Sequence, residues 1–254
     1  MSEFVLLGSL EKRGYGHAIC YPRFDFMEFQ KRLSEMKRLG VEALSFAGNK
    51  KVENVQVLGK GYVGVVILAK TKAGLVAMKV RRTDSGREGM GHEAEVLAKA
   101  NNVNVGPKLL GYSENLLLME YVDGLPFPKW VEGFKATKKA RSAAKRVISE
   151  VLEQCWRLDE AGVDHGELSN AQKHFLVRSD GGVCILDFES ASTKRRVSNV
   201  TSVCHYLFVR SSVAEAVRGK IVDVDLASLL RALRAYKESN TRENFEAIFR
   251  LCVS

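Results

Sequence analysis

The chain shows two kinds of hydrophobic pattern, one typical of strands and one typical of helices. Apolar residues, many of them β-branched, follow one another in short runs between residues 57 and 122, and such runs predict strands. Apolar residues three and four positions apart predict amphipathic helices at residues 25–39, 88–100, 134–158, 200–210, 222–236 and 243–252. A strand-rich segment followed by a series of helices indicates an α+β fold.

Composition places the chain among ordinary globular proteins. Hydrophobic residues make up 46% and charged residues 27% of the 254 residues, a length that suits one two-lobed domain or two small domains. The sequence has no apolar run of membrane-spanning length and no signal-peptide pattern, so we expect a cytoplasmic protein without membrane contact. The five cysteines are scattered and never form a C-x-x-C pair, which predicts small buried side chains rather than disulfides or a zinc site.

Positive charge adds one expectation about partners. The formal net charge is +9 and the pI is about 9.3, which fits an anionic partner such as RNA or simply a nucleotide-binding protein. Lysines and arginines are densest in the predicted helix at residues 135–146. This basic face is either a solvated surface or a docking site for RNA or an acidic protein.

A glycine-rich motif begins the strand-rich segment. Residues 59–66 have the form G-x-G-x-x-G-x-V, and a β-branched run follows the third glycine. This predicts a strand, a tight turn and a returning strand, whereas the last glycine of a Rossmann motif opens a helix. Glycines at this spacing let backbone N–H groups approach an anion closely, and a nucleoside triphosphate is the obvious candidate.

One lysine stands inside the apolar strand that follows. Lys79 lies within Leu75–Val80, and a buried ammonium is costly unless phosphate oxygens or a carboxylate pair with it. In the next predicted helix, Glu93 shares a face with apolar residues four and seven positions further on, so it can point inward towards Lys79. Glu95 and Glu88 are the alternatives.

The densest group of polar residues comes later, at residues 163–177. A loop containing His165, Glu167 and His174 ends in a short strand, and a hairpin turn leads into a second strand that stops at Asp187. An aspartate at the end of a buried strand is well placed to hold a divalent ion. Further upstream, the apolar strand 115–122 ends in a polar turn whose backbone groups could bind an adenine edge.

In this combination and order, residues 55–190 resemble the protein-kinase-like superfamily. The His165-Gly166-Glu167 loop and the short helical C-terminal part are most similar to small atypical RIO-like kinases of archaeal type, including relatives of the kinase in the tRNA-modifying KEOPS complex. The resemblance implies a two-lobed fold. Residues 51–124 would form an N-terminal lobe of antiparallel strands with one main helix, residues 125–254 a reduced helical C-terminal lobe, and residues 1–50 a short helical extension.

The resemblance also implies roles for individual residues. ATP and Mg²⁺ would be the cofactors, with Lys79 on the phosphates, Glu93 holding Lys79, and Asp187 on the metal. Met119 would be the gatekeeper beside the adenine. The remaining nucleotide contacts would come from Gly59, Gly61, Gly64, Val66, Glu120 and Val122.

Two positions depart from the family pattern. Glu167 stands where the family has the aspartate that accepts the substrate proton; the carboxylate is kept but is one methylene longer. The position of the family's metal-binding asparagine depends on how the chain is aligned. Alignment on the following strand places His174 there, a count of five residues from Glu167 places Gln172 there, and Asn170 is a third candidate. We favour His174. Glu189 replaces the glycine of the D-F-G motif, a glycine that RIO-like kinases also lack.

The expected activity is therefore ATP- and Mg²⁺-dependent phosphotransfer. The resemblance implies an atypical serine/threonine-protein kinase with a protein hydroxyl as substrate, capable of autophosphorylation. The alternative is a nucleotide-binding pseudokinase or an ATPase-like switch acting in an RNA or ribonucleoprotein complex.

Overall fold

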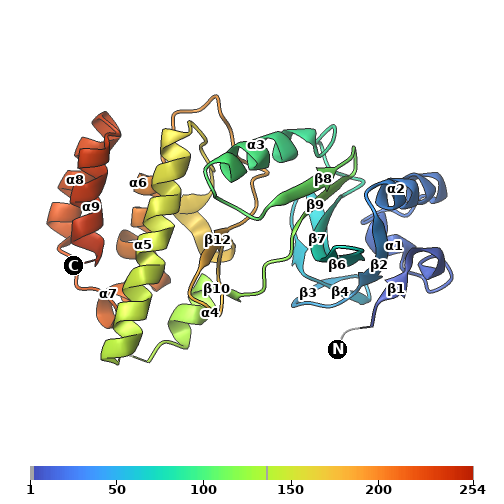
Figure 1. Ribbon diagram of the computed structural model, residues 1–254, viewed down its shortest axis with the longest axis horizontal. Helices are drawn as coiled ribbons and strands as arrows, with labels where there is room; N and C mark the ends of the chain where they lie inside the picture. The colour runs from blue at the N-terminus through green and yellow to red at the C-terminus, as the bar shows by residue number, and fades with distance from the viewer. Residues whose placement is uncertain (1–2, 136, 254) are drawn as a thin grey trace. The chain divides into compact units, whose positions relative to one another are not determined.

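The computed structural model describes residues 3–135 and 137–253, and these fall into two compact units (Figure 1). The first unit consists of Met1–Ala98 and Lys108–Tyr121, and the second of Lys99–Pro107 and Val122–Ser254. The architecture is α+β, as expected, with an antiparallel sheet and many helices. Within the described residues, no helix has both the length and the apolar character that a membrane span requires.

An antiparallel sheet of seven described strands forms the body of the first unit, in the order β1-β2-β6-β7-β9-β8 with β5 paired to β6. The strands are β1 (Val5–Leu6), β2 (Val41–Ser45), β5 (Gly59–Lys60), β6 (Gly64–Thr71), β7 (Gly74–Arg81), β8 (Leu109–Tyr112) and β9 (Leu116–Glu120). A separate hairpin joins β3 (Lys50–Val52) to β4 (Val55–Val57). The predicted strands of this region are confirmed.

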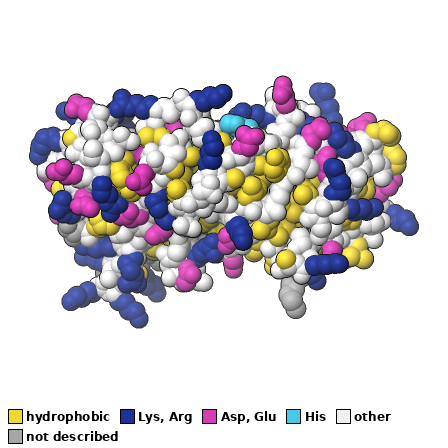
Figure 2. Space-filling model, turned by 45° about the horizontal axis from the view of Figure 1, so that its top comes forward, with side chains coloured by type: hydrophobic (Ala, Val, Ile, Leu, Met, Phe, Trp, Pro, Cys, Tyr) yellow, Lys and Arg dark blue, Asp and Glu magenta, His cyan; other side chains and the backbone are white. Residues whose placement is uncertain are grey.

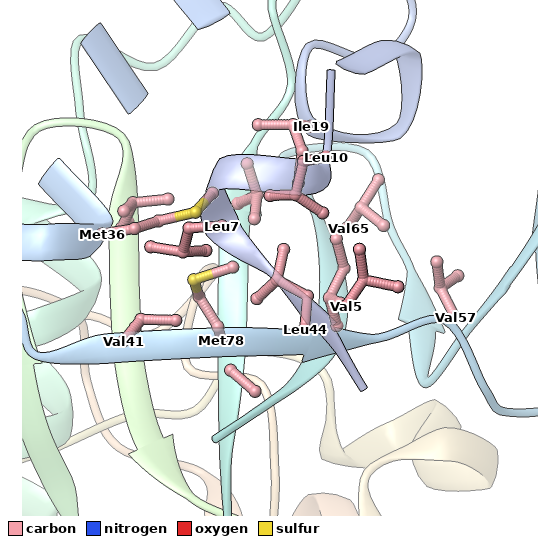
Figure 3. Close-up of a cluster of buried hydrophobic side chains, with 14 of the residues drawn as sticks. Val5, Leu7, Leu10, Ile19, Met36, Val41, Leu44, Val57, Val65 and Met78 are labelled. Atoms are coloured by element: carbon pink, nitrogen blue, oxygen red, sulfur yellow. The ribbon is translucent and has the colours of Figure 1, made fainter. Parts of the chain in front are cut away.

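The N-terminal fifty residues cover one face of this sheet. The helical elements η1 (Leu7–Ser9), α1 (Gly16–Ile19) and α2 (Phe26–Arg38) contribute Leu7, Ile19 and Met36 to the main apolar cluster, which also contains Val65 and Met78 of the sheet (Figure 3). The predicted helix at residues 25–39 is confirmed as α2. The expectation of a purely helical extension is corrected, because β1 and β2 join the sheet itself.

The opposite face of the sheet carries the candidate chemistry. Successive side chains of a strand point to opposite faces, so Lys79 lies opposite the face that buries Met78 and Val80. Helix α3 (Gly91–Asn102) supplies Glu93 to Lys79, and its last residues belong to the second unit.

The second unit is mostly helical and is built around one long helix. Its helices are α4 (Phe127–Glu132), α5 (Lys138–Glu160), α6 (Asn199–Cys204), the π-helix η3 (His205–Val209), α7 (Ser212–Lys220), α8 (Leu226–Glu238) and α9 (Arg242–Val253). Helix α5 packs against α6, α9 and a small sheet. That sheet pairs β10 (Leu125–Pro126), β11 (Phe175–Val177) and β12 (Val183–Ile185), and η2 (Leu168–Lys173) precedes β11.

Three details of the predicted helices are corrected. The helix expected from residue 134, with its basic part at 135–146, begins at Lys138 because the Thr137 side chain caps it by accepting a hydrogen bond from the Ala140 N–H (3.2 Å). Ala136 lies outside the described residues. The helix expected at 200–210 changes to a π-helix after Cys204, and α4 and α7 were not expected. All five cysteines are buried, as predicted.

Candidate functional site

The glycine motif forms a hairpin between β5 and β6. Gly59 pairs with Val66, and the Gly61 N–H donates to the Gly64 carbonyl (2.8 Å), which closes the turn. Tyr62 stands at the tip and is 89% exposed. The predicted strand, tight turn and returning strand are therefore confirmed.

Arg82 anchors the tip of this hairpin to the end of β7. Its backbone N–H donates to the Val63 carbonyl (2.8 Å) and its guanidinium donates to the Gly61 carbonyl (3.1 Å). The guanidinium also pairs with Asp84 (2.7 Å). An open cavity of about 570 Å³ lies beside the tip, lined by Tyr62, Val63, Arg82, Asp84, Ser85, Gly86 and Arg87. The turn is thus held by a cation as well as by its own backbone.

Lys79 and Glu93 form a buried ion pair. The Lys79 ammonium lies 2.9 Å from both carboxylate oxygens of Glu93, and the two residues are only 4% and 6% exposed. Lys79 occupies the middle of the sheet, with Val66 on one neighbouring strand and Leu117 on the other. Glu95 is exposed in α3 and Glu88 precedes this helix, so the partner of Lys79 is Glu93, as expected, and not Glu95 or Glu88.

Gly64 lies directly against this lysine. A Cβ atom at this position would come within 2.9 Å of Lys79 Cγ and 2.9 Å of the Val80 carbonyl oxygen, and the latter is backbone that does not move easily. At Gly59 the nearest atoms would be those of Val66, at 3.4 Å. The two glycines of the same hairpin therefore differ in how much space they leave.

We expect Gly64→Ala to cost about 1–3 kcal/mol of unfolding free energy, because the added methyl group overpacks a closed site. It should also displace Lys79 and so weaken the binding of ATP, the ligand that we expect from the sequence. Urea unfolding and nucleotide titration measure the two effects, and Gly59→Ala is the matched control. Equal behaviour of the two variants would contradict the prediction.

The remaining residues expected around the adenine lie at the end of β9. Met119 pairs with Ala77 and Glu120 with Val76 in the sheet. The Glu120 N–H donates to the Lys108 carbonyl (2.9 Å), so this group already has a partner within the first unit. Val122 is buried and belongs to the second unit.

In the second unit, the loop that carries Glu167 is tied to the segment after β12. Asp164 and Ser192 exchange two backbone hydrogen bonds (2.9 and 2.8 Å). Arg195 donates to the Asp164 carboxylate (2.9 Å) and to the Ser190 carbonyl (2.7 Å). Gly166 has a φ of +87°, and a Cβ atom there would lie 2.9 Å from the Ser190 carbonyl oxygen, so this turn requires glycine.

A buried network of polar side chains also holds the loop that carries Glu167. The Asn199 side chain accepts from the His165 N–H (2.9 Å) and donates to Asp159 (2.7 Å). The other carboxylate oxygen of Asp159 accepts from the Tyr236 hydroxyl (2.9 Å). Burial raises the pKa of Asp159, although the hydrogen bonds from Val200, Asn199 and Tyr236 oppose the shift. The backbone at His165 is thus fixed by groups from α5, α6 and α8.

The two histidines of the loop meet at one carbonyl group. His165 Nε2 lies 3.0 Å and His174 Nδ1 3.3 Å from the Leu186 carbonyl oxygen, and the two rings stack edge to face. Burial, followed by the charge of His174, lowers the pKa of His165 to about 4. His165 is therefore a neutral structural side chain at physiological pH.

The Glu167 side chain is partly exposed, and each of its carboxylate oxygens lies close to a polar side chain. Its Oε1 accepts from the Ser190 hydroxyl (2.6 Å), and its Oε2 lies 2.9 Å from His174 Nε2 without the alignment of a hydrogen bond. Burial alone would raise the pKa of Glu167, but the hydrogen bond from the Ser190 hydroxyl and the electrostatic effects of His174 and Lys173 outweigh it, and the net shift is downward. Glu167 is held as a carboxylate.

Asp187 follows β12 in a strained conformation. Its φ is +71°, in the left-handed region that aspartate tolerates better than most residues, and such positions cluster at functional sites. Its carboxylate lies 3.7 Å from the Lys173 ammonium and 4.0 Å from His174 Nδ1. The structure thus brings Glu167, His174 and Asp187 together.

The donor atoms present suit Mg²⁺ only in part. Asp187 and Glu167 offer carboxylate oxygens, which Mg²⁺ prefers, and this ion commonly takes one or two carboxylates and completes its shell with phosphate and water. His174 is 1% exposed and its two nitrogens face the oxygens of Leu186 and Glu167, so the geometry favours a positioning role for it. Asn170 and Gln172 are exposed. Among the described residues, no three His, Cys, Asp or Glu side chains form a metal cluster.

Four residues of this site were not anticipated from the sequence: Asp159, Ser190, Arg195 and Asn199. Each acts on a partner 23 to 40 positions away in the chain, and none has a periodic or motif signal. Asp159 precedes the polar loop and the other three follow β12 in the chain, and this closeness in sequence was the available hint.

No family model matches the chain. The uncharacterized protein MJ1211 from Methanocaldococcus jannaschii is 25% identical to it over 122 residues, which are 47% of this chain and 99% of that protein. The relative thus corresponds over its whole length to about half of this chain. Its name carries no activity, so the functional argument rests on the geometry described above.

Proposed function

We propose that this protein is an ATP- and Mg²⁺-dependent phosphotransferase of the atypical serine/threonine-protein kinase type, with its two units acting as the two lobes of a kinase-like fold. The observation that carries the proposal is the buried Lys79–Glu93 ion pair beside the glycine hairpin. A buried pair of this kind is seldom retained for stability alone, because apolar residues would be as stable or more so. A lysine held by both oxygens of a glutamate is preorganised to meet phosphate oxygens.

The second unit supplies the groups that would act on the acceptor. In this proposal Glu167 accepts the proton of a protein hydroxyl, and Asp187 would hold Mg²⁺ when the ion is bound. The metal would neutralise charge on the phosphates. The Ser190 hydroxyl would orient Glu167 through its hydrogen bond to Oε1, and His174 would flank the other oxygen, with Nε2 2.9 Å from Oε2.

Incubation of the purified protein with Mg²⁺ and γ-labelled ATP tests this function. Label on protein and released phosphate are followed together, with Asp187→Ala as the variant and Asp180→Ala, in the exposed hairpin turn before β12, as the matched control. We expect label in the wild type and in the control, and none in Asp187→Ala. A wild type that binds ATP but neither labels protein nor releases phosphate would exclude the proposal.

The second candidate is a nucleotide-binding pseudokinase or ATPase-like switch within an RNA or ribonucleoprotein complex. A specific observation favours an RNA contact. An open cavity of about 600 Å³ in the second unit is lined by Lys138, Arg141, Ser142 and Lys145 of α5 and by Ile221, Val222 and Asp223 after α7. Figure 2 shows Lys and Arg side chains gathered at the lower left, where α5 begins. Three cations on one helix face suit a phosphate backbone.

Removal of the positive charges that line this cavity is expected to reduce the salt dependence of RNA binding. The triple substitution Lys138→Ala, Arg141→Ala and Lys145→Ala removes three possible phosphate contacts, so the slope of log K against log salt should become shallower by about 2 to 3. The matched control replaces three exposed lysines of the first unit, Lys12, Lys37 and Lys72. Filter binding of a structured RNA between low and moderate salt measures both. Affinity that does not change with salt would exclude this contact.

A further inference from the structure

Ser190 presents its hydroxyl to the carboxylate that the proposed function makes the proton acceptor. Its Oγ donates to Glu167 Oε1 at 2.6 Å, a short hydrogen bond typical of a charged acceptor. Ser190 is half-buried and stands three residues after Asp187. A hydroxyl within hydrogen-bond reach of a carboxylate base is the arrangement that activates a serine nucleophile.

The backbone holds this hydroxyl in place. The Ser190 carbonyl accepts from Arg195 (2.7 Å), and the Ala191 N–H donates to the Phe188 carbonyl (3.1 Å). Two residues later, Ser192 is paired with Asp164 on the Glu167 loop. Both sides of the Ser190–Glu167 contact are therefore anchored within the second unit, and the contact does not depend on a flexible side chain alone.

The neighbouring hydroxyl of Ser192 is engaged differently. Its Oγ accepts from the Lys194 N–H (3.1 Å) and so completes a local turn. Ser192 thus shares the residue type and the sequence neighbourhood of Ser190, but its hydroxyl contacts the backbone rather than a carboxylate. This difference provides a matched control.

We propose that Ser190 is the acceptor of the chain's own phosphotransfer, an inference that rests on the function proposed above. The Ser190 Oγ proton passes to Glu167 while Oγ forms a bond to the γ-phosphorus of the nucleoside triphosphate. The bond between that phosphorus and the β,γ-bridging oxygen breaks. The products are phosphoserine and the nucleoside diphosphate, and Glu167 returns its proton to solvent.

The modification would change the state of Glu167. A phosphoserine carries about −1.5 to −2 charges at neutral pH and is repelled by nearby carboxylates. The Glu167 carboxylate lies 2.6 Å from the Ser190 hydroxyl. Phosphorylation would therefore drive Ser190 away from Glu167 and remove the hydroxyl that orients this carboxylate.

Site mapping in the wild type, Ser190→Ala and Ser192→Ala tests the inference. Each protein is incubated with Mg²⁺ and γ-labelled ATP, freed of nucleotide and digested with trypsin, and the peptide covering residues 179–194 is sequenced by mass spectrometry. We expect one phosphate on Ser190 in the wild type and in Ser192→Ala, and at least a tenfold loss of label from this peptide in Ser190→Ala. Phosphate release by the wild type is measured in parallel.

The outcomes distinguish the Ser190 assignment from the phosphotransferase function on which it rests. Phosphate release together with label only on other hydroxyls overturns the Ser190 assignment and leaves the phosphotransferase standing. If the wild type neither releases phosphate nor becomes labelled, both the Ser190 assignment and the phosphotransferase function are overturned. A nucleotide-free measurement tests the contact itself: Ser190→Ala should lower the melting temperature by about 2–4 °C, more than Ser192→Ala, because it removes a hydrogen bond to a carboxylate. Equal melting temperatures for the three proteins would overturn the inference as well.

Discussion

A Lys79→Met protein is expected to lose about 3–5 kcal/mol of unfolding free energy, because the Glu93 carboxylate would remain buried without its cation. The same substitution should lower phosphotransfer by about a hundredfold or more, since it removes a preorganised charge from the phosphates. Urea unfolding measures the first effect and γ-phosphate transfer the second. Both effects come from one side chain, so they must be separated.

The double variant Lys79→Met with Glu93→Leu separates them. With both charges removed, the site becomes apolar and most of the lost stability should return, as replacement of buried ion pairs by apolar residues generally allows. Phosphotransfer should stay as low as in Lys79→Met. Lys70→Met, on the exposed part of β6, is the control and should change stability by no more than about 0.5 kcal/mol. A double variant that regains transfer, or a stable and active Lys79→Met, would exclude the role of the pair.

This ion pair was predictable because its signal is local. Lys79 is conspicuous as a charge within an apolar strand, and Glu93 is marked by apolar residues on the same face of its helix. The strand and the helix follow each other in the chain, so the pairing needs only short-range reasoning. The glycine hairpin was predictable for the same reason, since its glycines and the following β-branched run lie within one short segment.

The N-terminal strands were less accessible to such reasoning. β1 contains two residues, too few for alternation to be recognised, and β2 pairs with β6 across more than twenty intervening residues. A strand of this kind is defined by the neighbour it finds in the fold, since side-chain packing rather than backbone preference determines much of strand propensity. Helix α2, with its regular apolar face and the Asp25 cap, was predictable from the sequence.

The candidate site of the second unit was predictable only as a collection of residues. The sequence identified Glu167, His174 and Asp187 as chemistry-bearing side chains, but the alternatives for the metal position depended on how an insertion is aligned. Their partners Ser190 and Arg195 act across loops that have no periodicity. Contacts of this kind follow from the tertiary fold, and a hydrophobic pattern carries no information about them.

Glu167→Gln is expected to reduce phosphotransfer by about 10²–10⁴-fold, the usual contribution of a general base, while nucleotide affinity changes little. The amide keeps the size of the side chain but accepts no proton. Glu160→Gln, at the exposed end of α5, is the matched control and should behave as wild type. Unchanged transfer by Glu167→Gln would exclude Glu167 as the proton acceptor.

Glu167→Asp gives a sharper test of whether the site is built for the longer carboxylate. Oε1 and Oε2 of Glu167 are positioned by Ser190 at 2.6 Å and by His174 at 2.9 Å, so a shorter side chain would withdraw by about 1 Å, a displacement that can cost about a hundredfold in rate. We expect Glu167→Asp to be impaired although aspartate is the residue found here in the family that the sequence resembles. Wild-type transfer by this variant would show that Ser190 and His174 do not set the geometry.

The pH dependence follows from the lowered pKa of Glu167. Burial alone would raise it, but the hydrogen bond from the Ser190 hydroxyl and the electrostatic effects of His174 and Lys173 shift it below the ordinary glutamate value. The carboxylate therefore remains ionised as the pH falls through the ordinary glutamate range, and the acidic limb of kcat/KM should appear only below that range. Its contribution to stability has the same sign: it is present above the unfolded-state pKa and is lost as the pH falls through the folded-state pKa. Ser190→Ala removes the largest of the interactions that lower the pKa of Glu167, so the acidic limb of the kcat/KM profile of this variant should move to higher pH. An unchanged limb would mean that the Ser190 hydroxyl does not keep Glu167 ionised.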